Sequence, residues 1–251
     1  MTNASERLTA LVHTHAGLHN DDLPYWEKLA RQHGSPILEL GCGSGRVLLH
    51  LAAQGFALVG VDNDPSALAF LEARLPGDPR PKPELLLADM RGLRLDRRFP
   101  LVILPCNTYS MFTAVERQSV LARVRQHLAP GGCFALSLPN PFTLLDLPVR
   151  SDFELEESFS DPLSGSQVQV FSAWRKYGSK LVVRWQYELL LPDGRVERDG
   201  LKARHYLVDL ETYQTEFAQA GFEMQTTSGD FSGTPFSDES PYMIVELSLT
   251  G

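Results

Sequence analysis

Short apolar runs alternate with helical patterns over the first half of the chain. Each run is four to six residues long, which is typical of a strand buried on both faces of a sheet. Between the runs, apolar residues recur at the spacing of a helix, as at Leu48, Leu51 and Ala52. The runs lie at residues 36–40, 56–61, 85–88, 101–104 and 133–138. Alternating strands and helices predict right-handed crossovers and a parallel, doubly wound sheet of the α/β class.

Two of the predicted helices begin at capping residues. Asp64 can accept hydrogen bonds from the first turn of a helix, and Pro65 suits the first helical position. Thr113 and Glu116 have the spacing of a capping box, so a second helix begins there. We expect this second helix to end at a turn over residues 129–132, before the strand at 133–138.

From about residue 152 the pattern changes to alternating, β-branched and aromatic segments with tight-turn sequences between them. This pattern predicts an antiparallel insertion rather than further crossover units. Helical spacing returns at Tyr213, Phe217 and Ala220, and strands at 222–227 and 242–249 then complete a seven-stranded, Rossmann-like sheet. The predicted parts are an N-terminal helical cap (1–33), a Rossmann-like domain (34–150 and 210–251) and an antiparallel β insertion on the substrate side (151–209).

Charge and cysteine content narrow the function. The 251 residues carry 23 basic and 31 acidic side chains, and the net charge of −8 argues against a dedicated nucleic-acid binder. No apolar stretch reaches the roughly 20 residues of a membrane span, and no leader-like run follows the start, so we expect a cytoplasmic protein without a membrane partner. Cys42, Cys106 and Cys133 are scattered, which excludes a disulfide framework, and we predict no metal site.

A glycine-rich loop follows the first predicted strand. Glu39 closes that strand, and Gly41, Gly43 and Gly45 then give the spacing GxGxG. Glycines here permit positive φ and let a ligand approach the bare backbone. The dinucleotide fingerprint GxGxxG requires a glycine at the next position, which is Arg46. The loop therefore fits an uncharged nucleoside joined to an amino acid better than a pyrophosphate.

Acidic residues close the next two predicted strands. Asp62 could accept hydrogen bonds from both hydroxyls of a ribose, or form a turn. Asp89 could receive an adenine amino group, and Met90 could pack on the ring or belong to the core. Each feature alone is weak, but their order on three successive strand ends predicts a nucleoside site.

Together these features resemble the class I S-adenosylmethionine-dependent methyltransferases. The likeness covers about residues 21–250, and the insertion is similar to that of small-molecule members, including sugar-amine and glycine N-methyltransferases. The matching segments are 39–45, 59–62, 88–90, 128–132 and 220–222.

The resemblance implies S-adenosyl-L-methionine as cofactor and a set of residues that contact it. Gly41, Gly43 and Gly45 would line its methionine portion, and Glu39 would orient the loop. Asp62 would hold the ribose, and Asp89 with Met90 would hold the adenine. The implied contact set also includes Cys42, Asn63 and Pro105.

Two residues are candidates for the chemistry of methyl transfer. Asn107 follows the fourth predicted strand, where this class touches the transferring methyl. It could accept a hydrogen bond from the nucleophile, contact the methionine amine, or cap the next helix. His205 lies where the inserted strands return to the sheet, and it is either a general base or an ordinary strand residue. No Asn/Asp-Pro-Pro-Tyr signature follows the fourth strand, which disfavours methylation of base amines.

The leading hypothesis is an enzyme that methylates a nitrogen or oxygen of a small molecule. A cofactor-binding sensor that has lost catalysis would keep the same loop, so the sequence does not separate the two. An NAD(P)-dependent oxidoreductase is disfavoured by Arg46 and by the lack of a Tyr-x-x-x-Lys pair. The acceptor stays open, as does the choice between a monomer and a homodimer.

Overall fold

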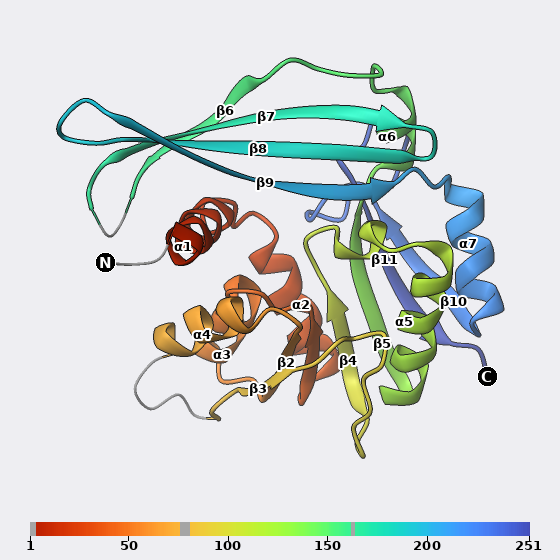
Figure 1. Ribbon diagram of the computed structural model, residues 1–251. Helices are drawn as coiled ribbons and strands as arrows, with labels where there is room; N and C mark the ends of the chain where they lie inside the picture. The colour runs from red at the N-terminus through yellow and green to blue at the C-terminus, as the bar shows by residue number, and fades with distance from the viewer. Residues whose placement is uncertain (1–3, 76–80, 162–163) are drawn as a thin grey trace. The chain divides into compact units, whose positions relative to one another are not determined.

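The strands of the chain form two separate sheets (Figure 1). The structure is a computed structural model that describes residues 4–75, 81–161 and 164–251. Its contacts divide the described chain into two units. The seven-stranded unit comprises Asp21–Leu145 and Val208–Gly251, and the four-stranded unit comprises Met1–Asn20 and Asp146–Leu207. Each unit is described by itself.

The larger sheet has the order β3-β2-β1-β4-β5-β11-β10. The first five of these strands are parallel, whereas β11 runs antiparallel to both of its neighbours. The strands are β1 (Ile37–Leu40), β2 (Leu58–Asp62), β3 (Glu84–Leu87), β4 (Phe99–Leu104), β5 (Leu128–Pro139), β10 (Phe222–Ser228) and β11 (Tyr242–Leu249). The predicted fold class, a doubly wound seven-stranded α/β sheet, is confirmed. The strand order reverses between β1 and β4, where ligands bind in open α/β sheets.

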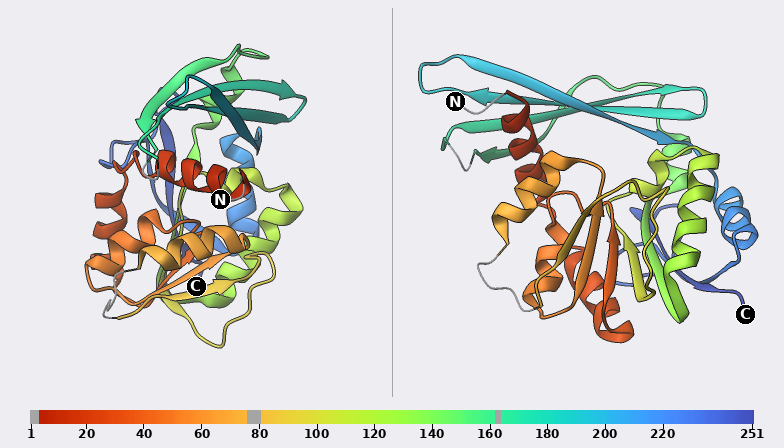
Figure 2. Two further views of the ribbon diagram at one scale, coloured as in Figure 1. Left: turned by 60° about the vertical axis from the view of Figure 1, so that its left-hand side comes forward. Right: turned by 60° about the horizontal axis from the view of Figure 1, so that its bottom comes forward.

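Helices cover both faces of this sheet (Figures 1 and 2). One hydrophobic cluster joins three helices to one face, and another joins two helices to the opposite face. The first group is α2 (Leu23–His33), α3 (Arg46–Ala53) and α4 (Pro65–Arg74), and the second is α5 (Ala114–His127) and α7 (Leu210–Gln219). A 3-10 turn η1 (Thr108–Met111) follows β4, and a short helix α6 (Pro141–Asp146) follows β5. None of the described helices has both the length and the hydropathy that a membrane crossing requires.

Local hydrogen bonds confirm the predicted helix starts. The Asp64 carboxylate accepts from the backbone N–H of Ser66 at 2.8 Å, and Pro65 begins α4. At α5, the Thr113 hydroxyl accepts from Glu116 N–H, and the Glu116 carboxylate accepts from Thr113 N–H, which is a complete capping box. These bonds satisfy backbone donors that have no partner inside a helix.

Strand β5 begins five residues earlier than the sequence predicts. Residues 129–132 were expected to form a turn, but they continue the strand from Leu128. The pairing of β4 with β5 shifts register between Phe99 and Leu101, and Gly131 has φ of 73°. This irregularity accommodates the Pro-Gly-Gly sequence within the ladder, because a bulge takes up the extra residues.

The four-stranded unit is an antiparallel meander, as the alternating pattern predicts. Its strands run in the order of the sequence: β6 (Glu154–Ser160), β7 (Gln167–Tyr177), β8 (Lys180–Leu190) and β9 (Val196–Tyr206). Helix α1 (Ala4–Ala16) packs on one face through Leu11, which joins a buried cluster with Val168 and Tyr187. His15 Nδ1 also lies 3.0 Å from the Tyr187 hydroxyl.

The units divide the N-terminal helices differently from the predicted boundaries. The prediction groups residues 1–33 as one cap, whereas α1 belongs to the four-stranded unit and α2 to the seven-stranded unit. The physical reason is the partner of each apolar face. Leu11 of α1 packs among the inserted strands, while Trp26 and Leu29 of α2 are buried against the larger sheet.

Substitution of Gly45 tests how tightly the glycine loop packs against α4. Gly45 precedes α3 with φ of 83°, and a Cβ placed there would lie 2.1 Å from Leu71 Cδ1 in α4. Gly55 has φ of 85° but open space around its missing Cβ, so it is a matched control. We expect Gly55→Ala to cost about 1–2 kcal/mol from left-handed strain, and Gly45→Ala about 2–5 kcal/mol because overpacking is added. Urea unfolding measures both, and equal losses would contradict the packing argument.

Candidate cofactor site

A cavity of about 230 Å³ opens at the carboxyl ends of β1, β2 and β3. The segment after β4 closes its other side. The lining residues are Gly41, Asp62, Asn63, Ala88, Asp89, Met90, Thr108, Met111 and Phe112. Five predicted site residues therefore meet in one cavity: Gly41, Asp62, Asn63, Asp89 and Met90.

The glycine loop turns back on β2 through backbone hydrogen bonds. The N–H groups of Gly41 and Cys42 both donate to the carbonyl of Val61, at 2.7 and 3.0 Å. Gly41 has φ of 68°, and a Cβ there would lie 3.3 Å from Met90 Cε. A larger residue at this position would therefore combine backbone strain with contact against the cavity wall.

The other loop positions serve the loop itself. Around Gly43 a Cβ would meet open space, and its N–H donates to Asp62. Gly45 makes room for Leu71, and the Cys42 side chain is buried. Burial raises the pKa of the Cys42 thiol, so it stays protonated at neutral pH and packs as a small apolar group.

The Asp62 carboxylate is held in place by two backbone donors. Its Oδ2 accepts from Gly43 N–H at 2.7 Å, and its Oδ1 accepts from Asp64 N–H at 2.9 Å. A carboxylate offers about four lone-pair positions, so two backbone bonds leave room for further donors. Asp62 thus presents an oriented acceptor to the cavity, as a diol-binding residue requires.

Asp89 is paired with an arginine that the sequence reading missed. Arg91 donates to the carboxylate through Nε at 3.0 Å and Nη2 at 2.6 Å, and its backbone N–H donates at 2.9 Å. Arg91 also bonds the Glu116 carboxylate. The side-chain hydrogen bonds from Arg91 lower the pKa of Asp89, so the carboxylate is ionised and fixed beside the cavity. The sequence Asp-Met-Arg could have predicted this pair, because an arginine two residues after a carboxylate at a strand end can fold back and bond it.

Three further lining residues follow β4. Thr108, Met111 and Phe112 come from η1 and the residue after it, and sequence reasoning did not select them. Only their position could have indicated a role in the site, because they lie between the predicted fourth strand and the capping box at Thr113. Met111 and Phe112 add apolar side chains to the lining, and the guanidinium of Arg91 lies 5.9 Å from the Phe112 ring centroid.

Arg46, which stands where a dinucleotide site has its third glycine, forms a partly buried ion pair. Both of its terminal nitrogens bond the Asp22 carboxylate, Nη2 at 2.7 Å, and the indole N–H of Trp26 donates to the same carboxylate at 2.8 Å. These hydrogen bonds with Asp22 help raise the pKa of Arg46 despite its burial. The pair joins the start of α2 to the residue that follows the glycine loop.

Glu39 Oε2 and Asn107 Oδ1 are buried near this edge of the sheet, and neither has a hydrogen-bond partner in the part of the chain that the structure describes. Burial raises the pKa of Glu39 to about 8, although the nearby Arg46 charge opposes the shift. Glu39 is the penultimate residue of β1 and Asn107 lies in the segment after β4, and these strands are neighbours in the sheet. Unpaired buried acceptors are costly, so both favour a ligand that brings hydrogen-bond donors.

The backbone before η1 is strained as well. Cys106 and Asn107 both have left-handed backbone angles, with φ of 61° and 60°, which is uncommon for consecutive residues other than glycine. The Asn107 carbonyl accepts from the N–H and hydroxyl of Ser110, at 3.2 and 2.7 Å, and these bonds hold the turn. Such strain concentrates where a side chain must be aimed at a ligand.

The remaining predicted residues lie outside the cavity lining. Glu39 belongs to β1, and the other five belong to the loops after β1 and β4: Cys42, Gly43, Gly45, Pro105 and Asn107. The contacts of all six with a cofactor stay predictions. His205 belongs to the four-stranded unit, where it pairs with Leu181 on β8. Burial lowers the pKa of His205, so its imidazole is neutral at physiological pH.

The residues present fit S-adenosylmethionine. Its ammonium supplies donors of the kind that the unpaired Glu39 and Asn107 oxygens lack, and its ribose supplies hydroxyl donors for the oriented Asp62 carboxylate. The half-buried Met90 side chain offers an apolar surface for an adenine ring.

Comparison with known proteins finds similarity to methyltransferases. A family model described as a methyltransferase domain matches residues 37–132. A putative methyltransferase from Geobacillus sp. (GWCH70_2453) is 25% identical over 86% of this chain and 83% of its own length. The cypemycin N-terminal methyltransferase of Streptomyces sp. is 27% identical over 85% of this chain and 83% of its own length.

Solved structures of methyltransferases share the fold. An S-adenosylmethionine-dependent methyltransferase from Clostridium acetobutylicum superposes with a TM-score of 0.80 at 13% identity, covering 96% of this chain and 100% of its own. S-adenosylmethionine-bound CalS10, an amino pentose methyltransferase from Micromonospora echinaspora, gives 0.73 at 22% identity, covering 96% of each chain.

The buried Glu39 makes stability depend on pH. Between its unfolded pKa of 4.5 and its folded pKa of about 8, the unfolded chain releases the proton while the folded chain keeps it. Stability of the wild type therefore falls as pH rises through this window, by at most about 1.4 kcal/mol per pH unit. Glu39→Gln lacks this loss, so we expect the variant to gain stability relative to wild type from pH 5 to pH 8 in urea unfolding.

Glu116→Gln is the matched control for this measurement. Hydrogen bonds from the backbone and side chain of Thr113 lower the pKa of Glu116, so it is ionised in both states above pH 5. Its difference from wild type should be the same at pH 5 and pH 8. A constant difference for Glu39→Gln as well would show that Glu39 does not titrate between these values.

Proposed function

We propose that this chain, which is a class I S-adenosylmethionine-dependent methyltransferase, transfers the methyl group to a nitrogen or oxygen of a small molecule. The observation that carries the proposal is the buried Asn107 Oδ1, an unpaired acceptor beside the cofactor cavity. Similar proteins are named for such acceptors, among them an amino pentose methyltransferase and a sugar N-methyltransferase. These names support a small-molecule acceptor and favour nitrogen.

The cofactor supplies a methyl group already activated on a sulfonium, so the protein mainly has to bind and orient it. In our proposal Asp62 accepts the ribose hydroxyls, while Asp89 and Met90 receive the adenine. The Glu39 carboxyl group and the turn at Gly41 hold the methionine portion. Alignment of this kind supplies much of the acceleration in methyl transfer, because proximity and orientation lower the barrier without further chemistry.

The acceptor must lose a proton, either before or as it attacks. In our proposal the Asn107 oxygen accepts a hydrogen bond from the acceptor N–H or O–H, which orients its lone pair toward the methyl. His205 takes the proton that is released, and its neutral imidazole has the protonation state that a general base needs. Contact of Asn107 with the methionine ammonium is the alternative role, and the acceptor dependence of an Asn107→Ala variant separates the two.

Calorimetric titration tests the cofactor half of the proposal. We expect micromolar binding of S-adenosylmethionine and S-adenosylhomocysteine and no binding of NAD. Asp62→Ala removes the oriented carboxylate and should weaken both adenosyl ligands at least tenfold. The control is Asp64→Ala, which removes the α4 cap two residues away but no cavity-lining group, and which should keep the affinity. Unchanged affinity in Asp62→Ala would refute the ribose assignment, and an NAD signal would instead favour an oxidoreductase.

Product formation tests the catalytic half. The wild type is assayed with a panel of amines, amino sugars and hydroxylated metabolites, and mass spectrometry follows the added methyl. We expect transfer to at least one class of these acceptors. Cofactor binding without product across the whole panel would favour a non-catalytic sensor.

A pH profile tests His205. Activity of the wild type should rise with pH through the lowered pKa of this histidine, because only the neutral imidazole accepts a proton. His205→Gln should lose about 10²-fold or more in kcat and lack that rise, while its affinity for S-adenosylmethionine stays unchanged. His50→Gln, on α3, is the control and should keep the wild-type profile. An unaltered profile in His205→Gln would make His205 an ordinary strand residue.

A further inference from the structure

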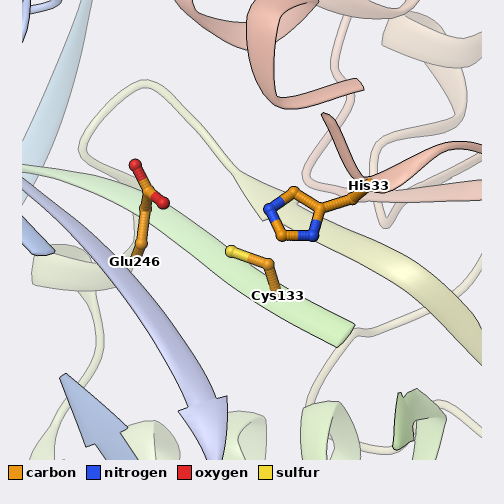
Figure 3. Close-up of side chains that lie close together, drawn as sticks. All are labelled: His33, Cys133 and Glu246. Carbon is orange, nitrogen blue, oxygen red and sulfur yellow. The ribbon is translucent and has the colours of Figure 1, made fainter. Parts of the chain in front are cut away.

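Three potential metal ligands from distant parts of the chain converge on one face of the seven-stranded sheet (Figure 3). His33 is the last residue of α2, Cys133 lies in β5, and Glu246 lies in β11. One ligand atom of each lies within 4.8 Å of the other two. Figure 3 shows the imidazole, the thiol and the carboxylate pointing toward a common space.

The three groups have unused bonding capacity. His33 Nε2 is buried and has no hydrogen-bond partner among the residues that the structure describes. Cys133 is a free thiol with 5% of its surface exposed. The Tyr25 hydroxyl donates to Glu246 Oε1 at 3.1 Å, which leaves Oε2 as a second carboxylate oxygen for another partner. A buried ring nitrogen without a partner is costly, and a ligand in this space would remove that cost.

We propose that His33 Nε2, Cys133 Sγ and a carboxylate oxygen of Glu246 bind one divalent cation of the zinc type. A nitrogen, a sulfur and an oxygen donor together favour a borderline-soft ion such as Zn²⁺ over Mg²⁺ or Ca²⁺, which prefer oxygen alone. Zinc bonds of about 2.0–2.3 Å place tetrahedral ligand atoms roughly 3.3–3.8 Å apart. The three ligand atoms lie within 4.8 Å of one another, so metal binding requires side-chain rotations that bring them closer by up to about 1.5 Å.

The charges of the site balance when the cation is bound. The thiol gives its proton to solvent as the sulfur–metal bond forms, so thiolate and carboxylate together carry two negative charges against two positive ones. Burial, reinforced by the Glu246 charge, raises the pKa of Cys133 to about 12, so the thiol keeps its proton when no metal is present. Three protein ligands leave a fourth position for water.

The cation would fasten the end of α2 to the sheet. The start of this helix is already held, because Asp22 bonds Arg46 and Trp26. A metal at His33 would fix the other end to β5 and β11, and so support the helix that shares a buried cluster with Cys42 of the glycine loop. The site departs from the sequence-based expectation of no metal. Residues this far apart along the chain have no ligand spacing to recognise.

Cobalt titration of the untagged, chelator-treated full chain tests the proposal. We expect Co²⁺ to bind with one equivalent, to give a near-ultraviolet sulfur-to-metal charge-transfer band and strong visible bands of a tetrahedral site, and to be displaced by Zn²⁺. Cys133→Ala should abolish the charge-transfer band, and His33→Gln should weaken binding at least tenfold. Cys106→Ala and His50→Gln remove a thiol and an imidazole elsewhere in the same unit, and both should leave the spectrum unchanged.

Thermal unfolding gives a second readout. Zinc should raise the unfolding temperature of the wild type but not that of His33→Gln, and circular dichroism establishes that each variant is folded. The absence of saturable binding, or a charge-transfer band that survives in Cys133→Ala and is lost in Cys106→Ala, would overturn the site. These measurements need no methyl acceptor, so their outcome is independent of the proposed function.

Discussion

The candidate cofactor site depends on the hydrogen bonds of the Asp62 carboxylate. This carboxylate accepts one hydrogen bond from Gly43 and another from Asp64, and so it joins the glycine loop after β1 to the start of α4. The Val61 carbonyl, one residue earlier, accepts from both Gly41 and Cys42. The end of β2 thus holds the glycine loop that follows β1, and the Asp62 carboxylate at this end also lines the cavity.

Around this anchor the protein keeps polar groups in places where they are costly without a ligand. Glu39 is buried with an unpaired oxygen, and Asn107 is held in a left-handed turn with its side-chain oxygen also unpaired. Arg46, by contrast, is ion-paired with Asp22, the N-cap residue of α2. The arrangement separates the charges that hold the scaffold from the acceptors that are left for a ligand, which is what a preorganised binding site requires.

Helix α2 links the two sites of the seven-stranded unit. Its first residues contact the Arg46 pair, and its last residue is His33 of the proposed cation site. Between them, Trp26 and Leu29 are buried against the sheet. Apolar burial therefore fixes the middle of the helix, while polar interactions determine the position of its ends.

The sequence by itself determined the fold class and the succession of strands and helices along the chain, and its resemblance to a known family implied the cofactor. Buried strands, capping residues and the GxGxG spacing each involve residues that are close together in the sequence. Such local patterns can therefore be recognised without the structure. The sequence also selected Asp62, Asp89 and Met90, because the carboxyl ends of parallel strands must meet at one edge of the sheet.

Only the tertiary structure decided which groups these residues contact. It placed Gly45 against Leu71 and paired Asp89 with Arg91. It also left the Oε2 atom of Glu39 without a partner among the described residues and extended β5 through its bulge. It also brought His33, Cys133 and Glu246 together. Burial and contact between distant segments arise only when the chain packs, and therefore no local pattern carried them.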